Sequence, residues 1–545
     1  MANALYYGDN LHVLRNEIAS DSVDLIYLDP PFNSQASYNV LFKSPSGKAA
    51  DAQIEAFEDT WHWGEQAERA FAEVLASPAT QAAELLRAMR SFLGENDMMA
   101  YLAMMAVRLV ELHRVLKPSG SFYLHCDPTA GHYLKILIDA VFEPTNFRNE
   151  VIWKRTSAHN SAKRFGPVHD AIFFYSKSDK YTWNSATQPI PQETIDAWYN
   201  NVEPETGRRF NRADLTAPGV RSGSSGMAWR EISPSAKGRH WAIPGYLGMQ
   251  NRDTLHALEE LDATGRLHWP KRGGMPMFKR YLDESPGIPA QDVIADIAPL
   301  NNSSSERLGY PTQKPVELLE RLIFASSNPG DLVLDPFCGC GTTIHAAQKL
   351  GRAWIGIDVT HLAISLIERR LKDAFPTISF DVHGTPKDLE SAIDLARRDK
   401  YQFQWWAVSL VDARPHGGKK KGADGGVDGI LFFRSDKDKT EKALVSVKGG
   451  GNVGVGMVRD LIAVVEREKA AIGVLITLAL PTRAMETEAA AAGFFESPFE
   501  SVPKLQIITL AELFHGIRPR IPRIDTAATF NAAARENTGT QGRLL

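Results

Sequence analysis

Short apolar runs alternate with amphipathic stretches over most of this chain. The run at 23–28 predicts a buried strand that ends at Asp29. Further strands are predicted at 121–125, 171–175, 332–334 and 353–357, and helices at 133–142, at 315–324 and from about residue 342 to about residue 350. Strands that alternate with helices predict a parallel, doubly wound α/β sheet.

The alternation of strands and helices is interrupted in the middle of the chain, within 156–305. This region is rich in Pro, Gly and Ser, and its apolar positions show little periodicity, so we expect irregular structure there. Periodic strands return later, at 472–477 and 505–509 among others, and predict a second α/β domain. We therefore expect two halves of one domain at 1–155 and 306–380, an insert at 156–305, a further domain at 390–522 and a mobile tail at 523–545.

Composition narrows the class of protein. The 545 residues are 43% hydrophobic and 23% charged, which is typical of soluble globular domains. No apolar run approaches the ~20 residues of a membrane span, and the N-terminus lacks a signal pattern. Three cysteines argue against a disulfide framework. We expect a cytoplasmic protein with no membrane partner. The net charge of -4 neither supports nor excludes a nucleic-acid partner.

A glycine-rich motif follows the strand predicted at 332–334. It reads Asp335-Pro336-Phe337-Cys338-Gly339-Cys340-Gly341-Thr342-Thr343. Glycine permits a tight turn and a close approach of the backbone to a ligand, and the helix start offers free N–H groups. Asp358 ends the next strand, where an acidic group can accept hydrogen bonds from ribose hydroxyls. The motif predicts a nucleotide-like cofactor, although a glycine turn alone is also common as plain structure.

A second motif, Asp29-Pro30-Pro31-Phe32, ends the strand at 23–28. The prolines stiffen the turn. An oxygen of Asp29 can accept hydrogen bonds from an exocyclic amino group and so aim the nitrogen lone pair at an electrophilic methyl group. Phe32 offers a flat face on which an extruded base can stack. The alternative is an ordinary strand-to-loop turn.

The two motifs, in this order and roughly three hundred residues apart, resemble those of the beta-class DNA amino-methyltransferases. The resemblance covers about residues 1–375, and the stretches 125–128 and 149–155 are similar to the modification subunits of type III restriction systems. It implies a Rossmann-like fold that uses S-adenosylmethionine, with double-stranded DNA as the partner. It assigns the catalytic role to the first motif, that is, to Asp29, Pro30, Pro31 and Phe32.

The resemblance also implies how the cofactor is held. Lys314, in the stretch 312–315, would lie near the methionine carboxylate, and Asp9 would line the cofactor adenine. The cofactor-binding residues expected in this way are Asp9, Lys314, Asp335, Phe337, Gly339, Gly341, Thr342 and Asp358. In the family pattern, Asp rather than Ser at position 29 favours adenine N-6 over cytosine N-4, and the cytosine alternative stays open.

In this resemblance, the insert at 156–305 corresponds to the target-recognition region of the family. Its cations can neutralise phosphates, and its tryptophans lie among them, although a solvated domain with buried tryptophans is the plainer alternative. A methyltransferase for RNA or for a protein amide would not need such a block. The residues in question are Lys163, Arg164, Arg208, Arg209, Arg212, Arg221, Lys237, Arg239, Lys271 and Arg272, with Trp198, Trp229, Trp241 and Trp269.

The C-terminal domain is similar to Mrr-like restriction endonucleases. Asp428 and Lys448 match the acid and the lysine of that fold, where the acid holds Mg2+. Ser446 stands where those enzymes usually have Glu or Gln, which puts cleavage in doubt. Two readings remain open, a Mg2+-dependent nuclease with Asp428 as metal ligand, and a non-catalytic DNA-binding module. The system implied is restriction-modification, with a homodimer or a restriction subunit as partner.

Overall fold

The computed structural model describes residues 3–31, 37–41, 53–58, 62–156, 163, 165–249, 252–271, 273–301, 304–308, 310, 312–416, 426–436, 439–498, 500–522, 524 and 533–536. The chain divides into two compact units. The first is formed by Met1–Ala186 and Gln291–Gly542, and the second is centred on Thr187–Ala290.

The first unit contains a nine-stranded sheet, in which every neighbouring pair is parallel except the two pairs made by β7. Segments from both ends of the chain alternate in it, so β2 lies directly beside β17. The strands, in spatial order, are β16 (Val293–Ile294), β6 (Phe147–Lys154), β7 (His169–Ser176), β5 (Leu116–Cys126), β2 (Val23–Leu28), β17 (Leu332–Asp335), β18 (Ala353–Asp358), β1 (Ala4–Tyr7) and β19 (Asp381–His383).

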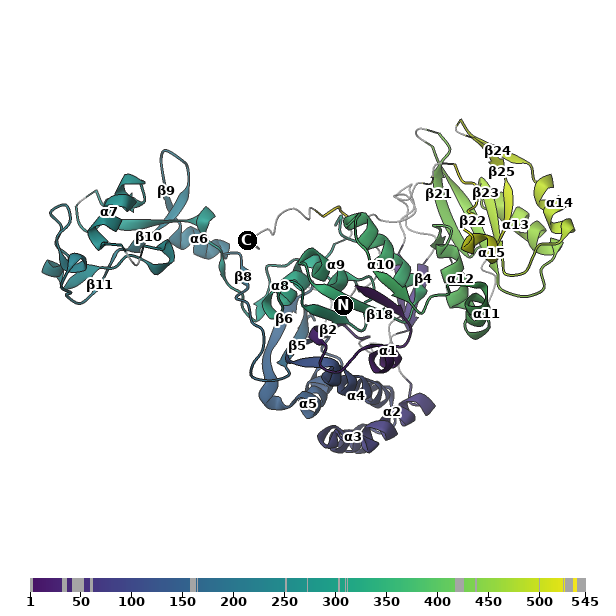
Figure 1. Cartoon of the computed structure of the whole chain (residues 1–545), viewed down its shortest axis with the longest axis horizontal. Helices are drawn as coiled ribbons and strands as arrows, with labels where there is room; N and C mark the ends of the chain where they lie inside the picture. Colours follow the sequence, from purple (N-terminus) through teal and green to yellow (C-terminus); the bar gives the residue numbers. More distant parts are fainter. Residues whose placement is uncertain are drawn as a thin grey trace. The chain divides into compact units, whose positions relative to one another are not determined.

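Helices cover both faces of this sheet, because its buried strands are apolar on both sides (Figure 1). On β2, Ile26 and Leu28 pack into one core, while Leu25 and Tyr27 pack into the other. The first core takes in α1 (Asn10–Glu17), α2 (Glu65–Ala76), α3 (Thr80–Leu93), α4 (Asp97–Val115) and α5 (Gly131–Phe142), and the second takes in α8 (Val316–Ser326), α9 (Thr342–Lys349) and α10 (His361–Ala374). The predicted doubly wound α/β fold is confirmed.

The second unit is smaller and more regular than the insert pattern predicts. Its core packs Trp229, Trp241 and Phe278. It lies within the predicted insert at 156–305, whereas β7, from the same range, is a strand of the main sheet. Its elements are a four-stranded sheet of β13 (Leu267–His268), β14 (Met277–Tyr281), β10 (Arg209–Asp214) and β9 (Asn201–Val202), the pair β11 (Thr216–Pro218) and β12 (Arg239–Trp241), and helices α6 (Gln192–Trp198) and α7 (Thr254–Ala263).

The C-terminal part of the first unit has its own five-stranded sheet and the predicted α/β character. Apolar side chains fill a core on each face of it. Its elements are β20 (Arg414–Pro415), β21 (Gly429–Arg434), β22 (Thr440–Lys448), β23 (Ile472–Thr477) and β26 (Leu505–Thr509), with α11 (Leu389–Arg398), α12 (Lys400–Ser409), α13 (Val455–Arg467), α14 (Arg483–Ala491), α15 (Leu510–Phe514) and the hairpin β24 (Phe494–Glu496) and β25 (Ser501–Pro503).

Part of the predicted mobile tail is held against α9 and α10. The backbone N–H of Glu536 donates to the carbonyl of Ala374 at 3.0 Å, and the Glu536 carboxylate pairs with His345 at 3.1 Å. Among the residues that the structure describes, no helix combines the length and apolarity that a bilayer crossing requires.

Candidate active site

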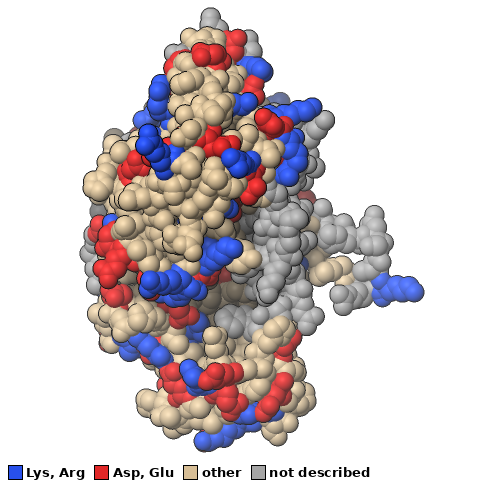
Figure 2. Space-filling view, turned by 90° about the vertical axis from the view of Figure 1, so that its right-hand side faces the viewer, with Lys and Arg blue, Asp and Glu red and all other residues tan. Residues whose placement is uncertain are grey.

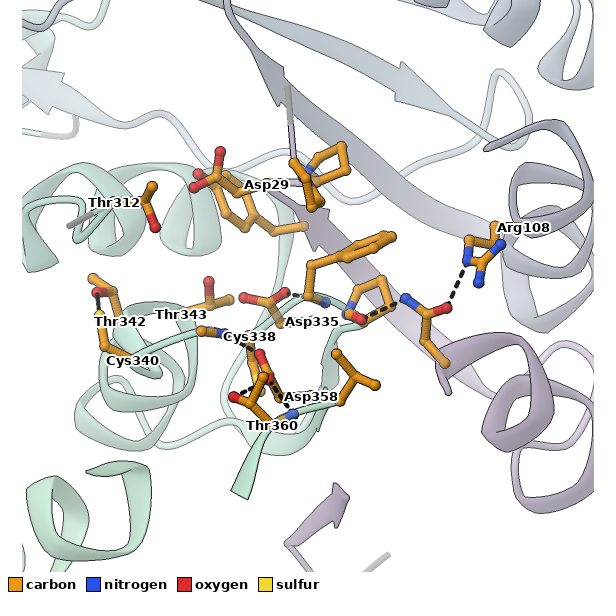
Figure 3. A pocket seen from close by; sticks show the side chains of 18 of the residues that line it. Asp29, Arg108, Thr312, Asp335, Cys338, Cys340, Thr342, Thr343, Asp358 and Thr360 are labelled. Atoms are coloured by element: carbon orange, nitrogen blue, oxygen red, sulfur yellow. Dashed lines mark hydrogen bonds between the residues drawn. The ribbon is translucent and has the colours of Figure 1, made fainter. Parts of the chain in front are cut away.

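The two motifs of the first unit meet at one cavity of about 400 Å³ (Figure 3). They meet because β2 and β17 are neighbours and parallel, so the residues that follow both strands emerge at the same edge of the sheet. The lining includes Asp29, Pro30 and Pro31 from the first motif and 335–340 from the second. Phe32 lies outside the described residues. A cavity of this size suits a drug-sized or nucleotide-sized ligand.

One carboxylate oxygen of Asp29 is in an ion pair, and the other has no hydrogen-bond partner among the described residues. Its Oδ2 forms an ion pair with the ammonium group of Lys314. Its Oδ1 is buried and has no hydrogen-bond partner among the described residues. A buried acceptor without a donor is costly, by about 1–3 kcal/mol. The cavity therefore has a place for a donor such as an amino group beside Asp29.

The glycine loop depends on left-handed backbone at two positions. Gly339 has φ of 48° and Gly341 has φ of 73°. A Cβ at Gly339 would lie 3.3 Å from the ring of Tyr310, and one at Gly341 would lie 2.7 Å from the side chain of Ile367. The turn feeds directly into α9, which begins at Thr342 and lines the cavity. Its free N–H groups face a polar ligand there.

Two acidic side chains at this loop are held by the loop itself. Asp335 accepts a hydrogen bond from the Phe337 N–H at 3.0 Å, and burial raises its pKa to about 7. Asp358 accepts from the Gly339 N–H at 3.0 Å and from the Thr360 N–H and hydroxyl at 2.8 Å each. Burial raises the pKa of Asp358 to about 6. A cationic ligand in the cavity would favour the ionised form of both carboxyl groups.

In the structure, Lys314 and Asp9 make contacts that the sequence analysis did not predict. Lys314 lines the cavity but pairs with Asp29. Asp9 also lines it, while its carboxylate caps α1 by accepting from the His12 N–H at 3.1 Å and pairs with Arg108 at 2.9 Å.

Arg108 is a residue that the sequence analysis missed. It is buried on α4, and its Nε donates to Asn10 Oδ1 at 2.7 Å. Asn10 in turn donates from Nδ2 to the carbonyl of Pro336 at 2.9 Å, so Arg108 and Asn10 tie the start of the chain to the glycine loop. The available signal was an arginine within a helix of otherwise apolar buried residues, Met99 to Leu109.

Comparison with known proteins identifies the first unit. The N6/N4 DNA methylase family matches residues 23–369, more than half of the chain. The chain belongs to this family. The inactive restriction endonuclease family described as NACHT-associated matches residues 413–515, so the methylase carries a restriction-endonuclease-like domain. Both resemblances expected from the sequence are confirmed at the level of the family.

Several relatives of this DNA methylase are curated proteins. It is 36% identical to the type II methyltransferase M.EcaI of Enterobacter cloacae over 50% of this chain and 57% of that protein. It is 26% identical to the type III StyLTI Mod subunit of Salmonella typhimurium over 64% and 50%. The chain thus spans about half the length of these two relatives. The DNA adenine methyltransferase YhdJ of Escherichia coli is 25% identical over 68% of this chain and 83% of that protein.

The candidate nuclease residues lie together on β21, β22 and the turn before them, but they do not form a metal site. Asp428 Oδ2 accepts from the Val447 N–H at 2.6 Å and from the Ser446 hydroxyl at 3.3 Å. Burial raises the pKa of Asp428. Over the described part of the chain, no group of three or more His, Cys, Asp or Glu side chains could hold a metal ion. The described residues therefore give no support for a Mg2+ site.

In the second unit, the candidate cations fall into two groups. Arg208, Arg209 and Arg239 form ion pairs with acidic neighbours of the same unit. In four exposed residues of this unit, the charged group has no ion pair or hydrogen bond to a described residue: Arg212, Arg221, Lys237 and Lys271. Arg164 and Arg272 lie outside the described residues.

The tryptophans of that unit also divide. Trp229 and Trp241 are buried in its core, whereas Trp198 is exposed and Trp269 stacks on Trp229 with ring centroids 5.6 Å apart. On the face of the molecule drawn in Figure 2, basic and acidic side chains are interspersed, without a broad area of one sign.

Proposed function

We propose that the chain is a site-specific DNA methyltransferase that transfers a methyl group from S-adenosylmethionine to the exocyclic N-6 of adenine. The observation that carries the proposal is the unpartnered Oδ1 of Asp29 in the cavity that the glycine loop also lines. An amino group supplies the missing donor, and its nitrogen lone pair then turns away from the carboxylate. Positioning of this kind provides most of the catalysis in a direct methyl transfer.

The residues around the cavity fit the cofactor. When bound, it supplies an electrophilic methyl group on a positively charged sulfur. Asp335 and Asp358 provide negative charge, and their ionisation is favoured by that cation. Gly339 can bring backbone close to the ligand, and Asp9, Phe337 and Thr342 line the same space. Gly341 does not line the cavity but allows the loop to pack against Ile367.

Two observations favour adenine over cytosine. The first motif begins with Asp29, the pattern of the adenine N-6 enzymes. YhdJ, which carries the name DNA adenine methyltransferase, is matched over 83% of its length. The cytosine N-4 reaction remains the second candidate because the family includes both. Incubation of DNA with the protein and labelled cofactor, followed by digestion to nucleosides, tests this directly. Methylated cytosine without methylated adenine would overturn the adenine assignment.

We infer that the second unit reads the DNA, with Arg212, Arg221, Lys237 and Lys271 as phosphate or base contacts. The charged groups of these four residues form no ion pair with a described residue, so their charge is available to a partner. Removal of two of them should weaken DNA binding and reduce its salt dependence, by ~0.9 in log–log slope per cation. Cofactor affinity should stay unchanged.

We infer further that the C-terminal domain contacts DNA without cutting it. Asp428 is committed to hydrogen bonds from its own fold, and the family that matches the domain is described as inactive. Incubation of unmethylated plasmid with Mg2+ or Mn2+ is the test, and cleavage that disappears in Lys448→Ala would favour the nuclease reading instead.

The match to a Mod subunit supports a role in restriction-modification, with a restriction subunit as partner and the cytoplasm, where DNA is accessible, as location. Co-purification with a nuclease subunit would support this role. If the protein protected host DNA when no such subunit was present, that result would contradict the need for a restriction subunit.

A further inference from the structure

A buried hydrogen-bonded chain runs sideways from the cavity across three strands. Tyr27 on β2 and His125 on β5 are joined by a contact of 2.8 Å between the Tyr27 hydroxyl and His125 Nδ1. His125 Nε2 lies 3.1 Å from Asp170 Oδ2 on β7. All three side chains are at most 2% exposed. The described contacts give this arrangement no place in holding the cofactor loop, so its function is open.

The relation of this chain to the catalytic carboxylate follows from the strand. Tyr27 lies on β2, and Asp29 directly follows the end of that strand, two residues further along the chain. Both line the cavity. The Tyr27 pKa is held well above its usual range by burial first, then by the carboxylates of Asp29, Asp335 and Asp170. The phenol therefore stays protonated.

The direction of each hydrogen bond follows from Asp170. Its pKa is lowered, because the hydrogen bond from His125 and the charges of Lys314 and Arg155 outweigh burial. An ionised carboxylate only accepts, so His125 Nε2 carries the hydrogen and Nδ1 accepts from Tyr27. In this order, the carboxylate orients the imidazole, and the imidazole can take the proton of the hydroxyl. The hydroxyl oxygen can then accept another proton as it gives up its own.

We propose that Tyr27, His125 and Asp170 form a relay that takes up the proton the target amine must lose. This proposal rests on the proposed function. The amine nitrogen forms a bond to the methyl carbon, and the carbon–sulfur bond breaks with its electron pair left on sulfur. One N–H bond then breaks with its electron pair left on nitrogen. That proton goes to Tyr27 Oη as the phenol proton moves to His125 Nδ1, which leaves an imidazolium beside Asp170.

Charge balance supports the relay. Before reaction, the carboxylates of Asp29 and Asp170 are matched by Lys314 and Arg155, which contact them directly. The reaction removes one positive charge from sulfur and the relay gains one on His125, so the charge around the cavity is conserved. Arg155 is 37% exposed, so the chain ends near solvent, where the proton can leave. His125 contacts Tyr27 from β2 and Asp170 from β7, and Arg155, which follows β6, contacts Asp170 in turn.

His125→Gln is the decisive variant. A glutamine amide can accept from Tyr27 and donate to Asp170, but it cannot take a proton. In single-turnover assays of the full chain with plasmid DNA, we expect methyl transfer to slow by about 10- to 100-fold. Cofactor affinity, measured by calorimetry, should stay within about twofold.

Tyr27→Phe gives an independent arm, because it deletes one oxygen. Tyr123→Phe is its matched control: Tyr123 is equally buried on β5 and donates or accepts a 2.6 Å hydrogen bond with Ser326, but it does not line the cavity. We expect Tyr27→Phe to slow transfer as His125→Gln does, and Tyr123→Phe to leave it within about twofold.

Two results would overturn the relay: a His125→Gln rate close to wild type, or a loss of rate matched by an equal loss of cofactor affinity. Each would leave the three side chains as structural supports. Failure of the wild-type protein to methylate DNA is distinguishable from both, because it would overturn the proposed function itself.

Discussion

Two acidic residues, Asp29 and Asp428, have similar surroundings in sequence but different ones in space. Each lies at the end or start of a strand in an α/β sheet, and each has a lysine near it, Lys314 or Lys448. Asp29 keeps one buried oxygen for which the described residues provide no donor. Asp428 accepts from the Val447 N–H and the Ser446 hydroxyl through a single oxygen.

The surrounding acids differ as well. Around Asp29, the cavity also contains Asp335 and Asp358, whose pKa values are raised by burial. Around Asp428, the described residues offer no set of acidic or histidine side chains for a metal. The comparison teaches that an acid in a recognisable motif supports chemistry only where the fold places further polar groups beside it. Matched substitutions in the two regions can break that conclusion.

The largest expected effect is that of Asp29→Ala. Loss of a group that acts mainly in the transition state should slow methyl transfer by at least about 100-fold, while cofactor affinity stays within about twofold. Asp428→Ala is the counterpart and should leave the methylation rate unchanged. Both are read by transfer of labelled methyl groups to DNA, with melting temperatures as a check on folding. An Asp29→Ala rate above about a tenth of wild type, a loss under ~1.4 kcal/mol, would contradict the assignment.

The next effect concerns the cofactor. Gly339→Val places a branched side chain at φ of 48° and against Tyr310, and Asp358→Ala removes the acceptor that holds the Gly339 N–H. Each should weaken S-adenosylmethionine binding by about tenfold or more, which is at least ~1.4 kcal/mol. Gly450→Ala in the C-terminal domain is a control, since a Cβ there meets nothing within 4 Å. Unchanged affinity in both cavity variants would mean that the loop is only structural.

Sequence reasoning located the strands and motifs of the first unit because their signals are local. The predicted strand at 23–28 coincides with β2, and that at 472–477 with β23. It did not find Arg108 or Tyr27, because their roles depend on partners about a hundred residues away. The second unit was expected to be irregular because its strands are short, two to six residues, and carry little periodicity.

Lys314 also shows a limit of prediction from local sequence. The motif at 312–315 correctly indicates a cavity residue, but local sequence cannot say which carboxylate the ammonium group contacts. In the structure that partner is Asp29, 285 positions away along the chain. The pairing depends on how α8 packs beside β2, which is a property of the assembled sheet.

A moderate effect is expected of pH on cofactor affinity. Asp335 and Asp358 have pKa values raised to about 7 and about 6, so part of each population is protonated in the free protein near neutral pH. A cation in the cavity lowers both pKa values, so binding releases protons and affinity should rise as pH increases from about 5.5 to about 8. We expect a rise of about three- to tenfold, measured by calorimetry in buffers of different ionisation enthalpy. Asp335→Asn should flatten it, and an affinity that falls with pH would contradict this origin.

The smallest effect is expected at the C-terminal domain, from Lys448→Ala. The Lys448 ammonium group makes no ion pair or hydrogen bond to a described residue, so its charge is available to a phosphate. Its loss should weaken DNA binding by about threefold and reduce the salt dependence by ~0.9 in log–log slope, as for one phosphate contact. Arg459→Ala is the matched control, because Arg459 is paired with Glu488 at 3.1 Å. Methylation should be unaffected in both. If Lys448→Ala instead abolished a Mg2+-dependent cleavage of unmethylated plasmid, the lone acid of this domain would be catalytic after all, and the contrast with Asp29 would fail.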